Sequence, residues 1–199
     1  MEKIVTTFSY GLCVISLENL QEFMKKEKIR SKKLLSFFQK KDKKFLVSQE
    51  RGVWMPIPQI NAGDYIIKVQ GVDQPFGDEF EEILEYEGFN IEITNGIWIG
   101  DIGLMQLFEV DKYVGDSISY QTIDGYTRYK GFKYDIPEGR YQISVKGYAH
   151  KNFEDYNTIK YGFLFAFKKV DEFDGYKNPR EEQYDFNVAS LKLKKEGLL

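Results

Sequence analysis

IPEGRYQISVKG (residues 136–147) has a counterpart earlier in the chain, INAGDYIIKVQG (residues 60–71). Both contain the pattern Gly-x-Tyr-x-Ile-x-Val-x-Gly, beginning at Gly63 and at Gly139. A glycine supplies the positive φ of a tight turn, and side chains alternate between the two faces of a strand. Each copy therefore predicts a turn that leads into a strand, with Tyr, Ile and Val on the buried face and the glycines setting turns.

A second echo relates residues 103–113 to residues 163–173, since both segments are apolar and end in Val-Asp-x-aromatic. The two echoes predict pseudo-repeated halves, residues 45–115 and 116–199, preceded by a strand and a helix in residues 1–44. The halves form either one sandwich or two small sandwiches side by side, unless the likeness is a coincidence between β-rich segments. The predicted fold is a single domain over 1–199, mainly β and an antiparallel β-sandwich.

Turn residues separate many short runs rich in β-branched and aromatic residues, as is typical of antiparallel sandwiches and barrels. Asn95-Gly96, between two alternating runs, is the strongest hairpin signal. The predicted strands are residues 4–15, 45–48, 53–57, 65–69, 89–94, 97–99, 104–110, 117–122, 127–135, 140–148, 160–170 and 184–193.

Residues 17–41 form the one predicted helical region, because Leu17, Leu20 and Phe23 recur at helical spacing after a capping Ser16. The region is basic: residues 1–44 hold 11 Lys/Arg against 5 Asp/Glu. We interpret these charges as the solvated face of a helix packed on a sheet. A nucleic acid or membrane partner is disfavoured, since no aromatic residue lies within 25–33 to stack on a base and the rest of the chain is acidic.

Composition indicates a cytoplasmic protein. Hydrophobic residues make up 42% of the 199, which suits a globular domain. Cys13 is the single cysteine, so no intrachain disulfide can form. The N-terminal residues lack the pattern of a signal peptide, and no apolar run has the length of a membrane span.

Residues with catalytic chemistry are scarce. His150 is the only histidine, and Cys13 lies in an apolar run, where we expect it to be core. The sequence contains no P-loop, no dinucleotide-binding glycine pattern and no Gly-x-Ser-x-Gly. We therefore predict no catalytic residue, no metal site and no cofactor. A hydrolase built on paired carboxylates remains an alternative.

Residues 73–87 contain seven carboxylates and no basic residue. They lack the EF-hand pattern, which argues against a calcium loop. One interpretation is a solvated loop or short surface helix. The other is a recognition surface, because carboxylates steer the approach of a basic protein. The candidate partner-binding residues are Asp73, Asp78, Glu79, Glu81, Glu82 and Glu85.

Two tryptophans support an alternative function. Trp54 and Trp98 would line a sugar-binding groove if they were exposed, although their apolar neighbours favour core or rim positions. The alternative is a β-sandwich module that binds carbohydrate or another small ligand.

FKYDIPEGRYQI (residues 132–143) resembles a segment of the bacterial competence-associated inhibitor of the DNA-entry nuclease. FNIEITNGIWI (residues 89–99) is similar to a strand-hairpin upstream of it in that family. The resemblance implies a cytoplasmic, non-enzymatic β-sandwich that blocks a nuclease by binding it. Immunity proteins that neutralise bacterial toxins are a similar class, so the expected partner is a basic toxin or nuclease.

Overall fold

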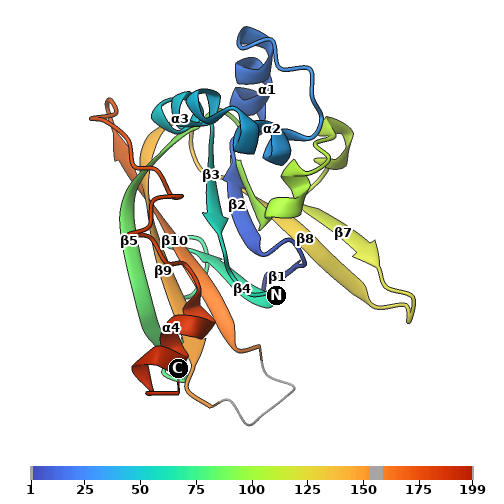
Figure 1. The fold of residues 1–199 in the computed structure, drawn as a ribbon. Helices are drawn as coiled ribbons and strands as arrows, with labels where there is room; N and C mark the ends of the chain where they lie inside the picture. The colour runs from blue at the N-terminus through green and yellow to red at the C-terminus, as the bar shows by residue number, and fades with distance from the viewer. Residues whose placement is uncertain (1, 153–158, 199) are drawn as a thin grey trace.

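A computed structural model describes residues 2–152 and 159–198, and these form two five-stranded sheets (Figure 1). In the first sheet β10 pairs in parallel with β4, and the other neighbours are antiparallel. The order of that sheet is β1 (Ile4–Thr7), β4 (Gly63–Val69), β10 (Tyr161–Val170), β9 (Gly139–His150) and β5 (Phe80–Ile93).

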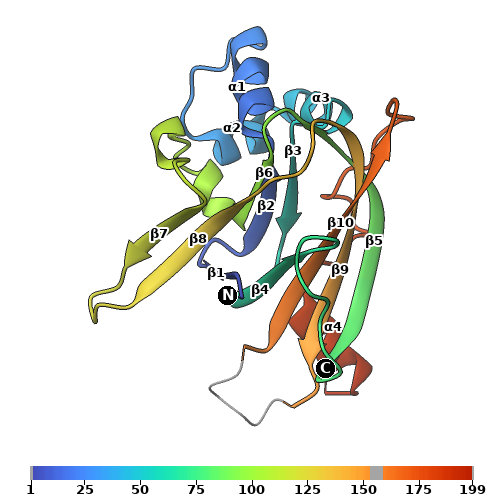
Figure 2. The same cartoon turned by 180° about the vertical axis from the view of Figure 1, so that it is seen from behind.

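The second sheet is antiparallel throughout. Its β7–β8 hairpin extends away from the rest of the molecule in both views (Figures 1 and 2). The order is β3 (Trp54–Pro58), β2 (Gly11–Ile15), β6 (Ile97–Asp101), β8 (Thr127–Tyr134) and β7 (Ser117–Gln121).

Helices lie at two ends of the molecule. Figures 1 and 2 show the first three helices grouped at one end of the second sheet. Helix α4 lies at the opposite end of the molecule, beside β5 and β9 of the first sheet. Their bounds are α1 (Leu17–Lys26), α2 (Leu34–Lys40), α3 (Asp42–Glu50) and α4 (Val188–Lys195), with 3₁₀ turns η1 (Ile102–Met105) and η2 (Val110–Lys112). No helix in the described ranges combines the length and apolar character needed to cross a membrane.

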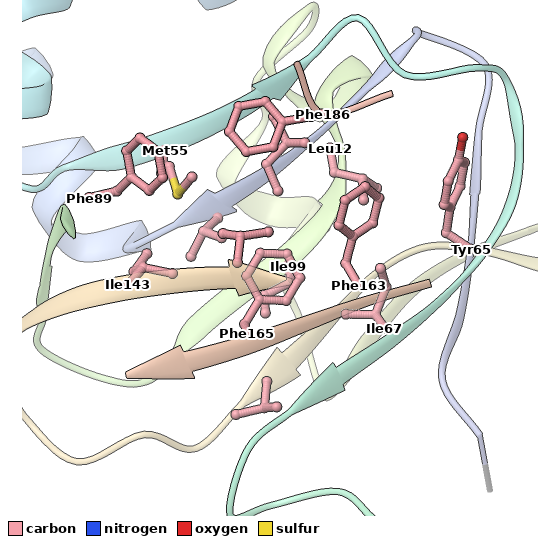
Figure 3. Packing of buried hydrophobic residues seen from close by; sticks show 14 of the residues in the cluster. Leu12, Met55, Tyr65, Ile67, Phe89, Ile99, Ile143, Phe163, Phe165 and Phe186 are labelled. Atoms are coloured by element: carbon pink, nitrogen blue, oxygen red, sulfur yellow. The ribbon is translucent and has the colours of Figure 1, made fainter. Parts of the chain in front are cut away.

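One core cluster receives side chains from both sheets (Figure 3). Leu12 and Ile99 of the second sheet meet Ile67, Ile143 and Phe165 of the first, and all five are 0–1% exposed. A second cluster lies under the first three helices, where the ring of Trp54 stacks on that of Phe38, 5.3 Å between centroids. The prediction of a mainly β fold is confirmed.

The two Gly-x-Tyr strands have the same turn geometry. Gly63 and Gly139 have φ of 151° and 147°. Tyr65 donates its hydroxyl hydrogen to the Asn61 carbonyl at 2.8 Å, and Tyr141 donates to the Pro137 carbonyl at 2.9 Å. Both strands belong to one sheet, with β10 between them. The predicted buried face is confirmed for the Tyr, Ile and Val positions of both copies.

Gly147 does not set a turn as predicted, because it lies inside β9. A Cβ atom there would come within 2.5 Å of Val188 Cγ2, so glycine permits α4 to approach the strand. The hairpin prediction at Asn95-Gly96 is also wrong. A turn occurs, with Gly96 at φ 68°, but β5 and β6 on either side of it join different sheets.

The predicted strand over residues 4–15 is two strands in different sheets. The chain turns at Tyr10, whose φ is 55°, and Thr7 Oγ1 lies 3.0 Å from the Gly11 carbonyl oxygen. A Cβ atom at Gly11 would lie 2.9 Å from the Ile57 carbonyl oxygen, so the close approach to β3 requires glycine.

Three further predicted strands are helical. Residues 45–48 lie in α3, where Phe45, Ser48 and Gln49 are buried at helical spacing. Residues 104–110 run from the end of one 3₁₀ turn, which is capped by Asp101, to the start of the next, so the second echo has no counterpart in structure. Residues 184–193 lead into α4, where Asn187 accepts from the Ser190 amide at 3.1 Å. Helices are thus not confined to residues 17–41.

Candidate functional site: a groove beside strand β3

The predicted acidic surface is neither a loop nor a helix over most of its length, because Glu81, Glu82 and Glu85 lie on strand β5. Glu81 pairs with Lys192 and, at 2.8 Å, with Lys195. These ammonium groups hold the pKa of Glu81 below its usual value. Both lysines come from α4, more than a hundred residues after Glu81 in the chain.

Glu82 and Glu85 share one lysine. Lys146 Nζ lies 3.1 Å from Glu82 Oε2 and 3.3 Å from Glu85 Oε1. A register shift between Glu82 and Leu84 places both glutamates on the side of the sheet that carries Lys146. Their charge is therefore partly compensated within the molecule.

The remaining three predicted residues precede β5. Asp73 accepts from the Val69 amide at 2.8 Å, which is a structural role in a turn. Asp78 and Glu79 are exposed, and among the described residues their carboxylates have no ion-pair partner. The six predicted residues thus do not form one uncompensated acidic surface: Asp78 and Glu79 have no ion-pair partner among the described residues, and the exposed Glu82 and Glu85 share Lys146.

The tryptophans do not line a surface groove, since Trp54 is 0% exposed and Trp98 is 3% exposed. Trp54 donates from Nε1 to Ser48 Oγ at 3.1 Å, so its one polar group is satisfied inside the protein. Cys13 is core as expected, and burial raises the pKa of its thiol. His150 ends β9 and accepts through Nδ1 from the Asn152 amide at 3.0 Å.

A groove of about 910 Å³ runs beside β3, an edge strand of the second sheet. Its lining residues come from the turn between β1 and β2, from α2, β3 and η1, and from α4 and the segment that precedes it. Its apolar lining comes from Leu35, Pro56, Pro58 and Ile102, and Tyr10 is 65% exposed beside them.

Backbone strain is concentrated at this groove. Tyr10 and Gln59 have φ of 55° and 60°, and both line it. In the described chain the one other non-glycine residue with positive φ is Lys28. Such conformations cost about 1–3 kcal/mol each and cluster at functional sites. The Ile60 amide donates to the Tyr10 carbonyl at 3.3 Å, which ties the two strained positions together.

Asp101 anchors the turn that carries Tyr10. Its carboxylate accepts from Thr7 Oγ1 at 2.9 Å and from the Gly103 amide at 3.1 Å, and Ser9 Oγ lies 3.5 Å away. Burial raises the pKa of Asp101, and these donors oppose the rise. The groove wall formed by Ser9, Tyr10 and Ile102 is therefore held by a buried polar network.

The rim of the groove is acidic. Glu181, Glu182 and Asp185 line it from a turn that begins at Asn178, whose side chain accepts from the Arg180 amide at 2.9 Å. Glu181 and Glu182 are exposed. Asp185 lies 3.8 Å from Lys194, so its charge is partly compensated.

Arg180 also lines the groove, and its guanidinium contacts residues of α2 and α3. Its guanidinium carbon lies 3.5 Å from the centroid of the Phe45 ring, and Nη1 donates to the Phe38 carbonyl at 3.3 Å. Burial lowers the pKa of Arg180. The side chain attaches the acidic turn to α2 and α3, leaving Glu181 and Glu182 as the exposed charges of the rim.

No cluster of three or more His, Cys, Asp or Glu side chains in the described ranges is placed to hold a metal ion. Comparison with family models, with curated proteins and with solved structures finds no match.

The rim is not apparent from the sequence, because residues 184–193 are predicted to be a strand and the longest acidic run lies at 73–87. Two signals point to the groove. Asn178-Pro179 is a turn signal directly before Glu181 and Glu182. Pro56 and Pro58 also indicate an edge strand, since proline is excluded from central strands.

Proposed function

We propose that the protein is a non-enzymatic binding protein whose groove beside β3 receives a basic protein partner. The observation that carries this proposal is a groove of mixed polar and apolar lining, rimmed by the exposed carboxylates of Glu181 and Glu182. Interfaces combine an apolar centre with a polar rim, and carboxylates accelerate the encounter with a positively charged partner.

The class of partner that we propose is a toxin or nuclease, which the protein neutralises as an immunity or inhibitor protein. Nuclease active sites are basic because they bind phosphate groups, so an acidic surface competes for them. The buried tryptophans withdraw support from the carbohydrate-binding alternative.

Architecture and location complete the proposal. We propose that the two sheets are the layers of a β-sandwich, since one core cluster contains side chains of both. The shared turn geometry at Tyr65 and Tyr141 supports a pseudo-repeat of those strands. The single, buried Cys13 is compatible with a reducing cytoplasm, where we propose that the protein acts.

The test is a calorimetric titration of the full chain against basic toxins and nucleases, beginning with any encoded beside its own gene. We expect a complex that weakens as salt is added. The variant Glu181→Lys/Glu182→Lys should lose at least about tenfold in affinity, because two attractions become repulsions.

The chain offers a matched control in Asp78→Lys/Glu79→Lys, which changes the net charge by the same amount at another exposed acidic pair. Its affinity should stay within about threefold of the wild type. Equal losses of affinity in both variants would show that binding depends on the net charge of the protein and not on the rim of the groove. Absence of binding across the panel would contradict the proposed function.

A further inference from the structure

The backbone groups of successive residues of β3 point alternately toward β2 and toward the free edge of the sheet. Ser16 donates its amide hydrogen to the Val53 carbonyl at 3.3 Å, so Val53 and every second residue after it face β2. Trp54 faces the other way, and its carbonyl accepts from Gln49 Nε2 at 3.1 Å. The backbone of Pro56 and Pro58 therefore also faces the free edge.

This edge offers acceptors without donors. Proline has no amide hydrogen, so Pro56 and Pro58 present carbonyl oxygens alone. In the described part of the chain, no backbone or side-chain donor reaches either carbonyl. Another strand cannot form a complete ladder here, because two of the required N–H groups are missing. The edge suits a guest with several donors.

We propose that the groove binds an arginine side chain of the partner, whose guanidinium donates to the Pro56 and Pro58 carbonyls beneath Glu181 and Glu182. This inference rests on the proposed function and names the chemistry of the contact. The rim carboxylates supply the opposite charge, and the exposed ring of Tyr10 offers an aromatic face on which a guanidinium stacks.

Geometry favours arginine over lysine. Carbonyls two residues apart on one edge are separated by about 6.5 Å, at about 3.3 Å per residue. A single ammonium nitrogen spans at most about 5.8 Å between two acceptors, twice a hydrogen-bond length of about 2.9 Å. A guanidinium distributes five N–H donors over three nitrogens, so it can reach both oxygens.

The test uses blocked pentapeptides, acetyl-Gly-Ser-X-Ser-Gly-amide, in which X is arginine, lysine or citrulline. Citrulline has nearly the shape of arginine without its charge. NMR titration of the isotopically labelled full chain follows the carbonyl carbons of Pro56 and Pro58 and the amides of Tyr10 and Gln59. We expect the arginine peptide to shift these signals and to bind at least about fivefold tighter than the lysine peptide and about tenfold tighter than the citrulline peptide.

Glu181→Gln/Glu182→Gln should weaken the arginine peptide at least about threefold, whereas Asp78→Asn/Glu79→Gln should leave its affinity within about 1.5-fold. Equal binding of lysine and arginine would overturn the inference. Shifts confined to residues 73–85, or none at the highest soluble peptide concentration, would also overturn it.

Two outcomes separate this inference from the proposed function. If a basic protein binds through Glu181 and Glu182 while the arginine peptide leaves Pro56 and Pro58 unshifted, the function stands and the arginine contact is wrong. If the arginine peptide binds as expected and no basic protein does, the groove chemistry stands and the proposed function is wrong.

Discussion

Two acidic regions of the molecule differ in how their charge is compensated. At the start of β5, Glu81 lies against Lys192 and Lys195, and Lys146 lies between Glu82 and Glu85. At the rim of the β3 groove, no described basic side chain pairs with Glu181 or Glu182. The β5 run has more acidic residues, but the rim exposes its charges to a partner.

The number of acidic residues in a segment therefore does not measure the negative charge that remains uncompensated in the folded protein. A strand directs alternate side chains to opposite faces, so each carboxylate of β5 meets whatever its own face packs against. On one face Glu82 and Glu85 lie beside Lys146 of the neighbouring strand β9, and on the other Glu81 lies against the lysines of α4. The rim lies in a turn, where side chains extend into solvent.

The largest expected effect of this comparison is on stability. Glu81→Ala removes one of the carboxylates that pair with Lys192, which is 5% exposed. Removing one member of a buried pair is strongly destabilising, and we expect a loss of about 2 kcal/mol in the free energy of unfolding. Glu182→Ala at the exposed rim should change it by less than about 0.5 kcal/mol. Urea unfolding of both variants measures the difference.

A double substitution sharpens this result. Glu81→Leu together with Lys192→Met removes both charges, so much of the lost stability should return, since apolar replacements of buried pairs are often neutral. If Glu81→Ala and Glu182→Ala destabilise equally, the distinction between compensated and free carboxylates is wrong.

A smaller effect concerns the dependence of stability on pH. The pKa of Glu81 is lowered in the folded state by Lys192 and Lys195. Its stabilisation is therefore present above the unfolded pKa and is lost as the pH falls through the folded pKa. Glu81→Gln should flatten the loss of stability in acid, measured by thermal melting from pH 7 downward.

The contribution of Asp101, beside the groove, to stability depends on pH in the opposite direction. Burial raises its pKa, so its contribution is fully present below the unfolded pKa and is lost as the pH rises through the folded pKa. Asp101→Asn should remove that loss on the alkaline side of the transition. Changes of the same sign in both variants would contradict the assigned causes.

Much of the fold is predictable from local patterns. Alternation and turn glycines correctly predict strands at residues 65–69, 117–122, 127–135 and 140–148, each within a few residues of the observed bounds. The errors occur where apolar residues have more than one possible period. Phe45, Ser48 and Gln49 are buried on a helix because α3 packs on Trp54, and a window of four residues does not contain that information.

The site was harder to predict than the fold. The turn that carries the rim is attached to α2, because Arg180 donates to the Phe38 carbonyl. This contact joins residues 142 positions apart in the sequence. The lysines that compensate β5 are likewise distant, and Lys192 meets Glu81 across 111 positions. Such pairings depend on the completed tertiary structure, so a charge count along one segment does not show which carboxylates are paired within the molecule.

The smallest expected effect concerns the backbone, which is strained at the groove and, among non-glycine residues, not at the start of β5. Gln59→Gly relieves a φ of 60° and should raise the free energy of unfolding by about 0.5–1 kcal/mol, because glycine adopts positive φ without steric cost. Lys28→Gly is the matched change, at φ 54° and outside the groove. Both variants should melt at higher temperature, but only Gln59→Gly should weaken the arginine peptide, since a flexible residue there no longer holds the turn at Tyr10. Equal peptide affinities in the two variants would show that the strain at Gln59 serves the fold and not the site.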